Sequence, residues 1–151
     1  MSTSPFDGEY EAPAQGWVRK QVEQYESSGG TEANTLMDTG LPVIIVTMVG
    51  AKSHKVRKAP LMRVENDGHY ALVASKGGTP ENPSWYHNIT AMPLVRIQDG
   101  PAPAEYDVRE LEGDERAEWW DRAVAAFPPY AEYQTKTGGR IIPVLLASPR
   151  G

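Results

Sequence analysis

Short apolar runs separated by turn residues extend along most of the chain, and this pattern predicts more strands than helices. The β-branched run at 42–49 is typical of a strand buried on both faces. Asn66-Asp67-Gly68 and Asp99-Gly100-Pro101 are typical of tight turns between neighbouring strands. Further strands are expected at 59–65, 69–74, 94–98, 104–111 and 141–147. The pattern indicates the α+β class, with about six strands in a small antiparallel barrel flanked by helices.

Helical periodicity appears in stretches that flank these strands. The first, at 13–27, places Val22 and Tyr25 on one face. Asn82 and Asp114 stand where N-terminal caps are expected for two later helices. Those later helices, and a short one after Pro128-Pro129, are expected at 83–90, 114–126 and 130–135.

The length of 151 residues suits a single core. Residues 1–12 combine glycine, proline and acids and are expected to form a flexible N-terminal tail, so the domain is expected to span 13–151. A net charge of -5 disfavours nucleic acid and polybasic membrane contacts. The chain has no cysteine, which excludes thiol catalysis and Cys–zinc sites. No secretory signal or membrane span is expected, and a cytoplasmic location follows as the expectation.

The densest group of candidate site residues is the site loop, residues 74–88, which follows a predicted strand. Ser75 and Lys76 offer a hydroxyl and a cation at the strand end, and Gly77-Gly78 let the backbone approach a ligand closely. A helix N-terminus and Trp85 follow within a dozen residues. Such a set suits a planar, anionic ligand. The alternative is an ordinary surface turn whose tryptophan belongs to the core.

A second candidate is the basic turn, residues 50–58, which holds Lys52, Lys55, Arg57 and Lys58 in an otherwise acidic protein. These cations predict a clamp for phosphate or carboxylate groups, with Lys76 joining it across the barrel. A solvated, charged hairpin is the alternative interpretation.

A third candidate is a pair of phenols. Tyr130 and Tyr133 share one helical face and could pack on a flat ligand while donating a hydrogen bond. They could equally cap the core. His87 is the histidine best placed for a ligand contact, and the three histidines lack metal-binding spacing, so no metal site is expected. The chain contains no P-loop, no Gly-x-Gly-x-x-Gly and no Gly-x-Ser-x-Gly motif.

In order and spacing, these motifs resemble the deazaflavin-dependent nitroreductase family of actinobacteria, whose members use coenzyme F420. The resemblance runs from about residue 42 to 147. It is carried by Gly50-Ala51-Lys52-Ser53, Arg57, Pro60-Leu61, Ala74-Ser75-Lys76-Gly77-Gly78, Asn82-Pro83-Ser84-Trp85-Tyr86, Pro93, Pro128, Tyr130, Tyr133-Gln134, Arg140 and Ile142-Pro143-Val144.

The resemblance implies a split antiparallel β-barrel, similar to flavin-mononucleotide oxidases of the pyridoxamine-phosphate type. It implies that the basic turn holds the coenzyme's phosphate and acidic tail, and that the catalytic groups are Tyr130, Tyr133 and Ser75. The cofactor-binding residues that it implies are Ala51, Lys52, Ser53, Arg57, Lys58, Ala59, Pro60, Leu61, Met62, Val73, Ala74, Ser75, Lys76, Ser84, Trp85, Tyr86, His87, Asn88 and Tyr130.

The implied function is an F420-dependent reductase that passes a hydride from reduced deazaflavin to a quinone, an activated C=C such as a coumarin-like lactone, or a nitroaromatic. Met62 and Phe127 stand where the best-known nitroreductases carry an aromatic and a tyrosine, and they make the substrate pocket less polar. A non-catalytic F420 carrier and an FMN-dependent oxidase on the same barrel are the alternatives. A monomer is expected, with a homodimer as the alternative.

Overall fold

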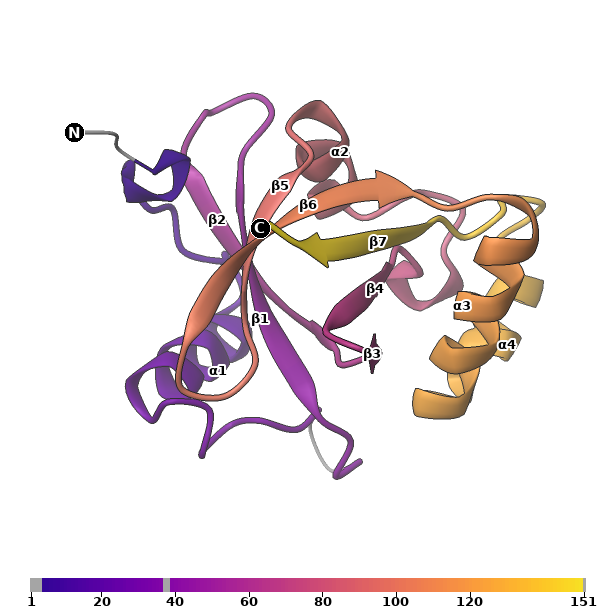
Figure 1. Cartoon of the computed structure of the whole chain (residues 1–151), viewed down its shortest axis with the longest axis horizontal. Helices are drawn as coiled ribbons and strands as arrows, with labels where there is room; N and C mark the ends of the chain where they lie inside the picture. Colours follow the sequence, from indigo (N-terminus) through magenta and orange to yellow (C-terminus); the bar gives the residue numbers. More distant parts are fainter. Residues whose placement is uncertain (1–3, 37–38, 151) are drawn as a thin grey trace.

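Seven antiparallel strands form one curled sheet in the computed structural model, which describes residues 4–36 and 39–150 (Figure 1). The strand order is β2-β1-β5-β6-β7-β4-β3. The strands are β1 Val43–Val49, β2 Val56–Met62, β3 Glu65–Asn66, β4 His69–Val73, β5 Leu94–Gln98, β6 Pro103–Glu110 and β7 Val144–Pro149. Curling of this sheet, with helices around it, gives the α+β split barrel that the sequence predicts.

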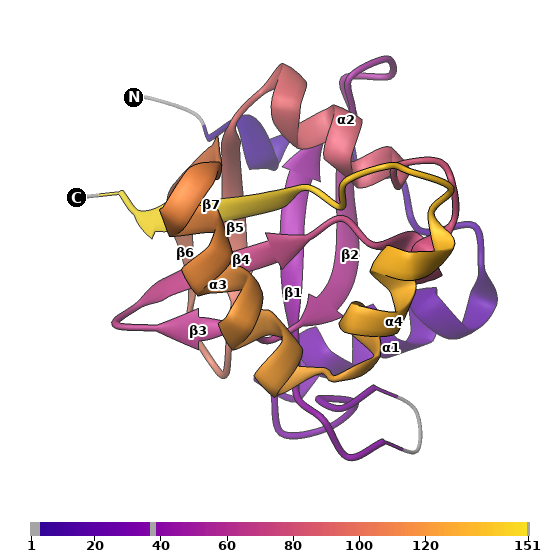
Figure 2. The same cartoon turned by 90° about the vertical axis from the view of Figure 1, so that its right-hand side faces the viewer.

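Helices cover the barrel from several sides. The helix α1 packs against β2, and α2 lies over β1. Figure 2 shows α3 crossing in front of β4 and β7, with α4 beside it. Their bounds are α1 Gly16–Ser27, α2 Ser84–Ala91, α3 Gly113–Ala126 and α4 Pro129–Lys136, with short 3-10 turns η1 Pro5–Asp7 and η2 Lys76–Gly78.

Both faces of β1 are buried, as its unbroken apolar run predicts. Ile44 and Val46 pack in a core cluster with strands β4 and β5, while Val43 and Ile45 pack in a second cluster with α3 and α4. Burial in two clusters explains why this strand lacks the apolar–polar alternation of a half-exposed one.

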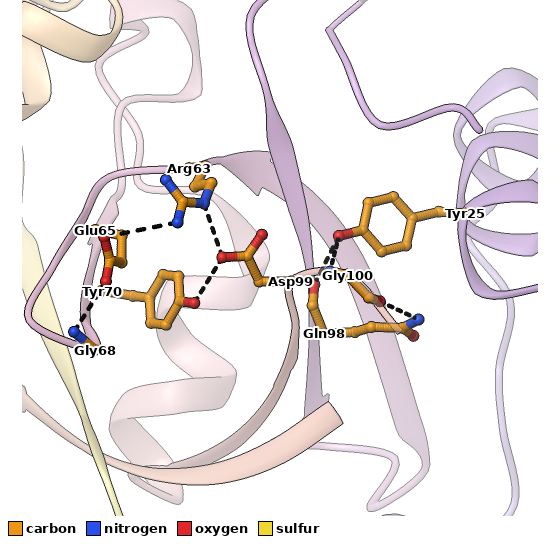
Figure 3. Close-up of polar contacts among 8 residues, drawn as sticks. All are labelled: Tyr25, Arg63, Glu65, Gly68, Tyr70, Gln98, Asp99 and Gly100. Atoms are coloured by element: carbon orange, nitrogen blue, oxygen red, sulfur yellow. Dashed lines mark hydrogen bonds and ion pairs between the residues drawn. The ribbon is translucent and has the colours of Figure 1, made fainter. Parts of the chain in front are cut away.

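An aspartate joins the two outer parts of the curled sheet (Figure 3). Asp99 lies just after β5, and its Oδ2 accepts hydrogen bonds from Arg63 Nε and from the Tyr70 hydroxyl, both at 2.7 Å. Arg63 follows β2 and Tyr70 belongs to β4, so one carboxylate connects segments from opposite ends of the strand order. Burial, together with the hydrogen bond to Asp99, raises the pKa of Tyr70.

The strand boundaries differ from the sequence predictions mainly at β2. This strand begins at Val56 rather than at 59, and it ends at Met62. Arg57 and Lys58, expected in a turn, are therefore strand residues, because seven consecutive pairs with β1 extend to Val49. The structure has one strand more than predicted, β3, which has only two residues. Strand β7 starts at Val144 rather than at 141.

Neither predicted helix cap is observed. The N-cap of α2 is Pro83, and the side chain of Asn82 instead accepts a hydrogen bond from Arg140 at 2.6 Å. Asp114 lies inside the first turn of α3, where its charge favours the positive helix end. The N-cap of that helix is Glu112, which makes no side-chain cap bond.

The described part of the predicted flexible tail, residues 4–12, is packed on the barrel. Phe6 is 6% exposed, and the Arg96 guanidinium lies 5.3 Å from its ring centre. Val56 donates its N–H to the Glu9 carbonyl at 2.8 Å and accepts from the Glu11 N–H at 2.9 Å. The segment thus extends the open edge of β2, a contact that local sequence composition does not reveal.

None of the described helices combines the length and the apolar composition needed to cross a membrane.

Candidate functional site

A cavity of about 760 Å³ opens between the basic turn, the first half of β2 and the start of α2. Its walls come from four separate segments of the chain. They are Glu11, Met48, Gly50, Ala51, Lys52, Ser53, Arg57, Lys58, Ala59, Ser84, Trp85, His87 and Asn88. Ten of these residues belong to the set that the sequence resemblance implies for the cofactor.

The connection between β1 and β2 is shaped by short polar contacts. Gly50 donates its N–H to the Lys55 carbonyl at 2.8 Å, and Ser53 Oγ accepts from the Lys55 N–H at 3.1 Å. A Cβ on Gly50 would lie 2.6 Å from Ser53 Oγ, so any larger residue here would force the Ser53 side chain to move and would disturb its bond to Lys55. The Ala51 N–H donates to Asn88 Oδ1 at 2.9 Å, which ties the turn to α2. These hydrogen bonds therefore fix the conformation of the basic turn and attach it to α2.

Several cations of the basic turn are paired with the protein's own acids. Arg57 lies 3.4 Å from Glu11, and Lys58 contacts Glu26. Lys52, in contrast, has no ion-pair partner among the residues that the structure describes. Because such partly exposed ion pairs are weak, an anionic ligand can replace Glu11 and Glu26 as the partner of these cations.

The first turn of α2 forms another wall of the cavity. Trp85 is partly buried against the core cluster of β4 and β5, and it also lines the cavity. Packing on the core therefore restricts the orientation of its ring. Ser84, His87 and Asn88 line the same wall. Tyr86 points elsewhere: its hydroxyl donates to Glu110 at 2.6 Å, which raises the pKa of Tyr86 to about 12. Tyr86 is therefore not part of this cavity.

The strand β2 leads from the cavity toward a second group of candidate residues. Ala59 lines the cavity, Leu61 packs in the cluster of Ile44, and Met62 packs in the same cluster as Tyr130. At roughly 3.3 Å per residue, this strand spans about 20 Å. Pro60 has no N–H to donate. It fits β2 because its nitrogen, like that of Val56, faces the open edge of the strand and not β1.

The second group surrounds Tyr130, which is 5% exposed. Its ring centre lies 4.9 Å from that of Phe127 and 6.3 Å from those of Tyr133 and Trp120. Burial raises the pKa of the Tyr130 phenol. Its hydroxyl has no hydrogen-bond partner among the described residues. The ring thus belongs to the core, in agreement with the core-capping alternative, and its hydroxyl donates to none of the residues that the structure describes.

Ser75 directly precedes η2, and η2 contacts α4, the helix that carries Tyr130 and Tyr133. It is 9% exposed, and its hydroxyl likewise has no partner in the described part of the chain. Val73 packs in the cluster of Tyr130, and the Ala74 N–H donates to the Pro143 carbonyl at 3.0 Å.

Lys76 does not line the cavity, although the sequence led us to expect it in the same clamp. It has a positive φ of 44° and lies 3.8 Å from Glu81, in an exposed ion pair. The structure thus forms two groups: the cavity residues at one end of β2, and Ser75, Tyr130 and Tyr133 near the other.

Comparison with known proteins identifies the family. The family model of the F420H(2)-dependent quinone reductases matches residues 17–149. The chain belongs to this family. The F420H(2)-dependent quinone reductase Rv1261c of Mycobacterium tuberculosis H37Rv is 33% identical over 112 residues, which cover 72% of this chain and 74% of the relative.

Two solved structures are similar to this chain over most of their length. A structure described as an F420-H2 dependent reductase (FDR-A) is 56% identical to this chain and has a TM-score of 0.67. The matched region covers 71% of this chain and 94% of the chain in that structure. Another, described as a domain-swapped dimer, is 52% identical, covers 87% and 97% respectively, and has a TM-score of 0.69. The resemblance to F420-using proteins and the split-barrel prediction are confirmed.

Glu11, Met48 and Gly50 line the cavity but were absent from the predicted set. Met48 could have been found, because the strand that contains it leads directly into the basic turn. Glu11 could not, since its position depends on the edge contact of the N-terminal segment with Val56.

Proposed function

We propose that this protein is an F420-dependent reductase that transfers a hydride to a quinone or to another electron-poor acceptor. The observation that carries the proposal is a cavity lined by three cations in an acidic protein of the F420H(2)-dependent quinone reductase family. Its volume falls within the range of small-molecule sites.

The residues of the cavity fit the coenzyme. Lys52, Arg57 and Lys58 would hold phosphate and carboxylate groups, since ammonium and guanidinium groups are the usual partners of such anions. Trp85 would provide a flat wall for a ring system. The direction of β2 supports an extended ligand, because the strand leads from these cations to the cluster of Tyr130.

When bound, the reduced deazaflavin supplies the hydride, and the protein supplies position and electrostatics. Tyr130 keeps its proton because burial raises the pKa of its phenol. Its unpartnered hydroxyl can therefore donate a hydrogen bond or a proton to an oxygen of the acceptor that gains negative charge. Ser75 and Tyr133 would assist as further hydroxyl donors. Apolar Met62 and Phe127 favour a flat, weakly polar acceptor such as a quinone.

The test is the steady-state oxidation of reduced F420 by a panel of quinones, coumarin-like lactones and nitroaromatics. We expect turnover with quinones, and we expect Tyr130→Phe to lower kcat by about tenfold to a hundredfold while changing cofactor affinity little. Tyr86→Phe is the matched control, since that phenol bonds Glu110 outside the cavity. Tight binding without turnover of any acceptor would instead make the protein a carrier, and preferential binding of FMN would make it a flavin oxidase.

We also propose a cytoplasmic monomer, in which the basic turn, β2 and α2 of one chain enclose the cavity. One relative is described as a domain-swapped dimer, so exchange of a segment between copies is the competing arrangement. Size-exclusion chromatography with light scattering, at several protein concentrations, separates the two. A mass that stays at twice that of one chain upon dilution would contradict the monomer.

A further inference from the structure

Arg140 lies between α4 and β7, and its guanidinium group is surrounded by neutral acceptors. It donates to the carbonyls of Ala74 at 2.9 Å, Ser75 at 2.9 Å and Thr79 at 2.8 and 3.2 Å, and to Asn82 Oδ1 at 2.6 Å. These five bonds use all five N–H donors of the side chain. No carboxylate pairs with it among the described residues.

The acceptors all belong to residues 74–82, a segment whose own conformation is strained. Lys76, Gly77 and Gly78 are consecutive left-handed residues, with φ of 44°, 65° and 84°. A lysine in this region is unfavourable by itself, and the segment has few internal backbone bonds. The segment therefore depends on contacts from outside, and Arg140 provides five hydrogen bonds to it.

Arg140 is in turn fixed to α4. Its carbonyl accepts from Gln134 Nε2 at 2.7 Å and from Thr137 Oγ1 at 2.6 Å. Gln134 Oε1 also accepts from the Ile142 N–H at 2.9 Å, so both sides of the loop are held. Arg140 thereby adds a hydrogen-bonded connection to the direct contact between α4, which carries Tyr130 and Tyr133, and the segment that follows Ser75.

We propose that Arg140 is a positioning residue that sets the register of Ser75 against Tyr130 and Tyr133. The proposal rests on the proposed function for its catalytic consequence, and on the five hydrogen bonds for its structural part. Arginine is required because a planar fork reaches four acceptors at once, whereas a lysine ammonium presents a single point with three donors. Burial without a counter-charge lowers the pKa of Arg140, in agreement with a role in hydrogen bonding rather than in ion pairing.

The first arm of the test requires no cofactor. Hydrogen–deuterium exchange of Arg140→Lys should show faster exchange at 74–82, while residues 50–58, which contact Asn88 and not Arg140, stay unchanged. Arg109→Lys is the matched control, because it removes an exposed bidentate pair with Glu115. Unchanged exchange at 74–82 in Arg140→Lys would overturn the proposal.

The second arm compares binding with turnover. We expect Arg140→Lys to bind oxidised F420 within about threefold of the parent and to lower the single-turnover hydride-transfer rate by about tenfold to a hundredfold. Added guanidinium ion should restore part of the rate in Arg140→Ala. Equal losses of binding, rate and folded fraction would mean a merely structural role. A parent protein that binds no F420 would refute the proposed function, and the exchange arm would still decide the role of Arg140.

Discussion

The backbone N–H of Ala51 donates a hydrogen bond to Asn88 Oδ1 at 2.9 Å, although 37 residues separate them. The bond connects the basic turn to α2, two elements that both line the cavity. The position of Lys52, next to Ala51, is therefore determined by a helix that follows much later in the sequence.

Asn88→Ala should weaken F420 binding by about threefold to tenfold, since one hydrogen bond that orders a loop is worth about 0.5–1.5 kcal/mol. Fluorescence titration measures the effect. Asn34→Ala removes a comparable side-chain bond, to the Gly30 carbonyl at 2.8 Å, in a segment away from the cavity, and it should leave binding unchanged. Equal affinity in Asn88→Ala and the parent would show that the turn is ordered without this bond.

Glu11→Gln should strengthen binding of the anionic coenzyme. Glu11 lines the cavity and lies 3.4 Å from Arg57, so it competes with the ligand for that cation. Exposed pairs contribute about 0.2–1 kcal/mol, which corresponds to a gain of at most about fivefold. A deazaflavin without the acidic tail should bind both proteins equally. Glu118→Gln, in an exposed pair with Arg122, serves as the control, and weaker binding in Glu11→Gln would refute the competition.

Gly78→Ala should destabilise the protein and lower turnover. Its φ is +84°, and an added Cβ would lie 2.6 Å from the Tyr133 carbonyl oxygen, a backbone atom that cannot move away easily. We expect a loss of about 2–4 kcal/mol in the free energy of unfolding.

Gly77→Ala is the matched control for that substitution. Gly77 has a similar φ of +65°, but an added Cβ would meet nothing within 4 Å. Only the backbone strain of about 1 kcal/mol remains. Denaturant unfolding of both variants separates strain from collision, and equal losses in the two would show that contact with Tyr133 contributes nothing.

The stability of the protein should fall at alkaline pH because of Tyr70. Its pKa is higher in the folded chain than the ordinary value of 10.0, so the neutral phenol is favoured by folding. This stabilisation is complete below pH 10 and is lost as the pH rises above it, since the unfolded chain then releases a proton that the folded chain retains. The difference in unfolding free energy between the parent and Tyr70→Phe should shrink from about pH 8 to about pH 11. A constant difference would contradict the assignment.

Much of the sheet could be predicted from local pattern. The strands at 43–49 and 94–98 show their burial directly in apolar residues, and turns at Asp67-Gly68 and Gly100 require left-handed backbone that the sequence supplies. The start of β2 could not be predicted, because Arg57 and Lys58 become strand residues only by pairing with β1.

The cavity was also accessible to sequence reasoning, since most of its walls come from two short motifs. The position of Lys76 outside the cavity could not be predicted from the sequence. That lysine lies on a segment whose path is set by Arg140, 64 residues later in the chain, and no local feature of 74–82 reveals the contact. The packing of Phe6 on the barrel escaped prediction for the same reason.

The most direct test of the account is a fluorescence titration of the parent and of Lys52→Ala with oxidised F420 and, in parallel, with FMN, at low and high salt. Lys52 is the cavity cation without an ion-pair partner in the described part of the chain, so it can bind the ligand without breaking an ion pair to a described residue. We expect tight, salt-sensitive binding of F420 in preference to FMN, and a loss of about tenfold or more in Lys52→Ala. Equal affinity of the two proteins for F420, or preference for FMN, would contradict the assignment of this cavity to the coenzyme's acidic tail.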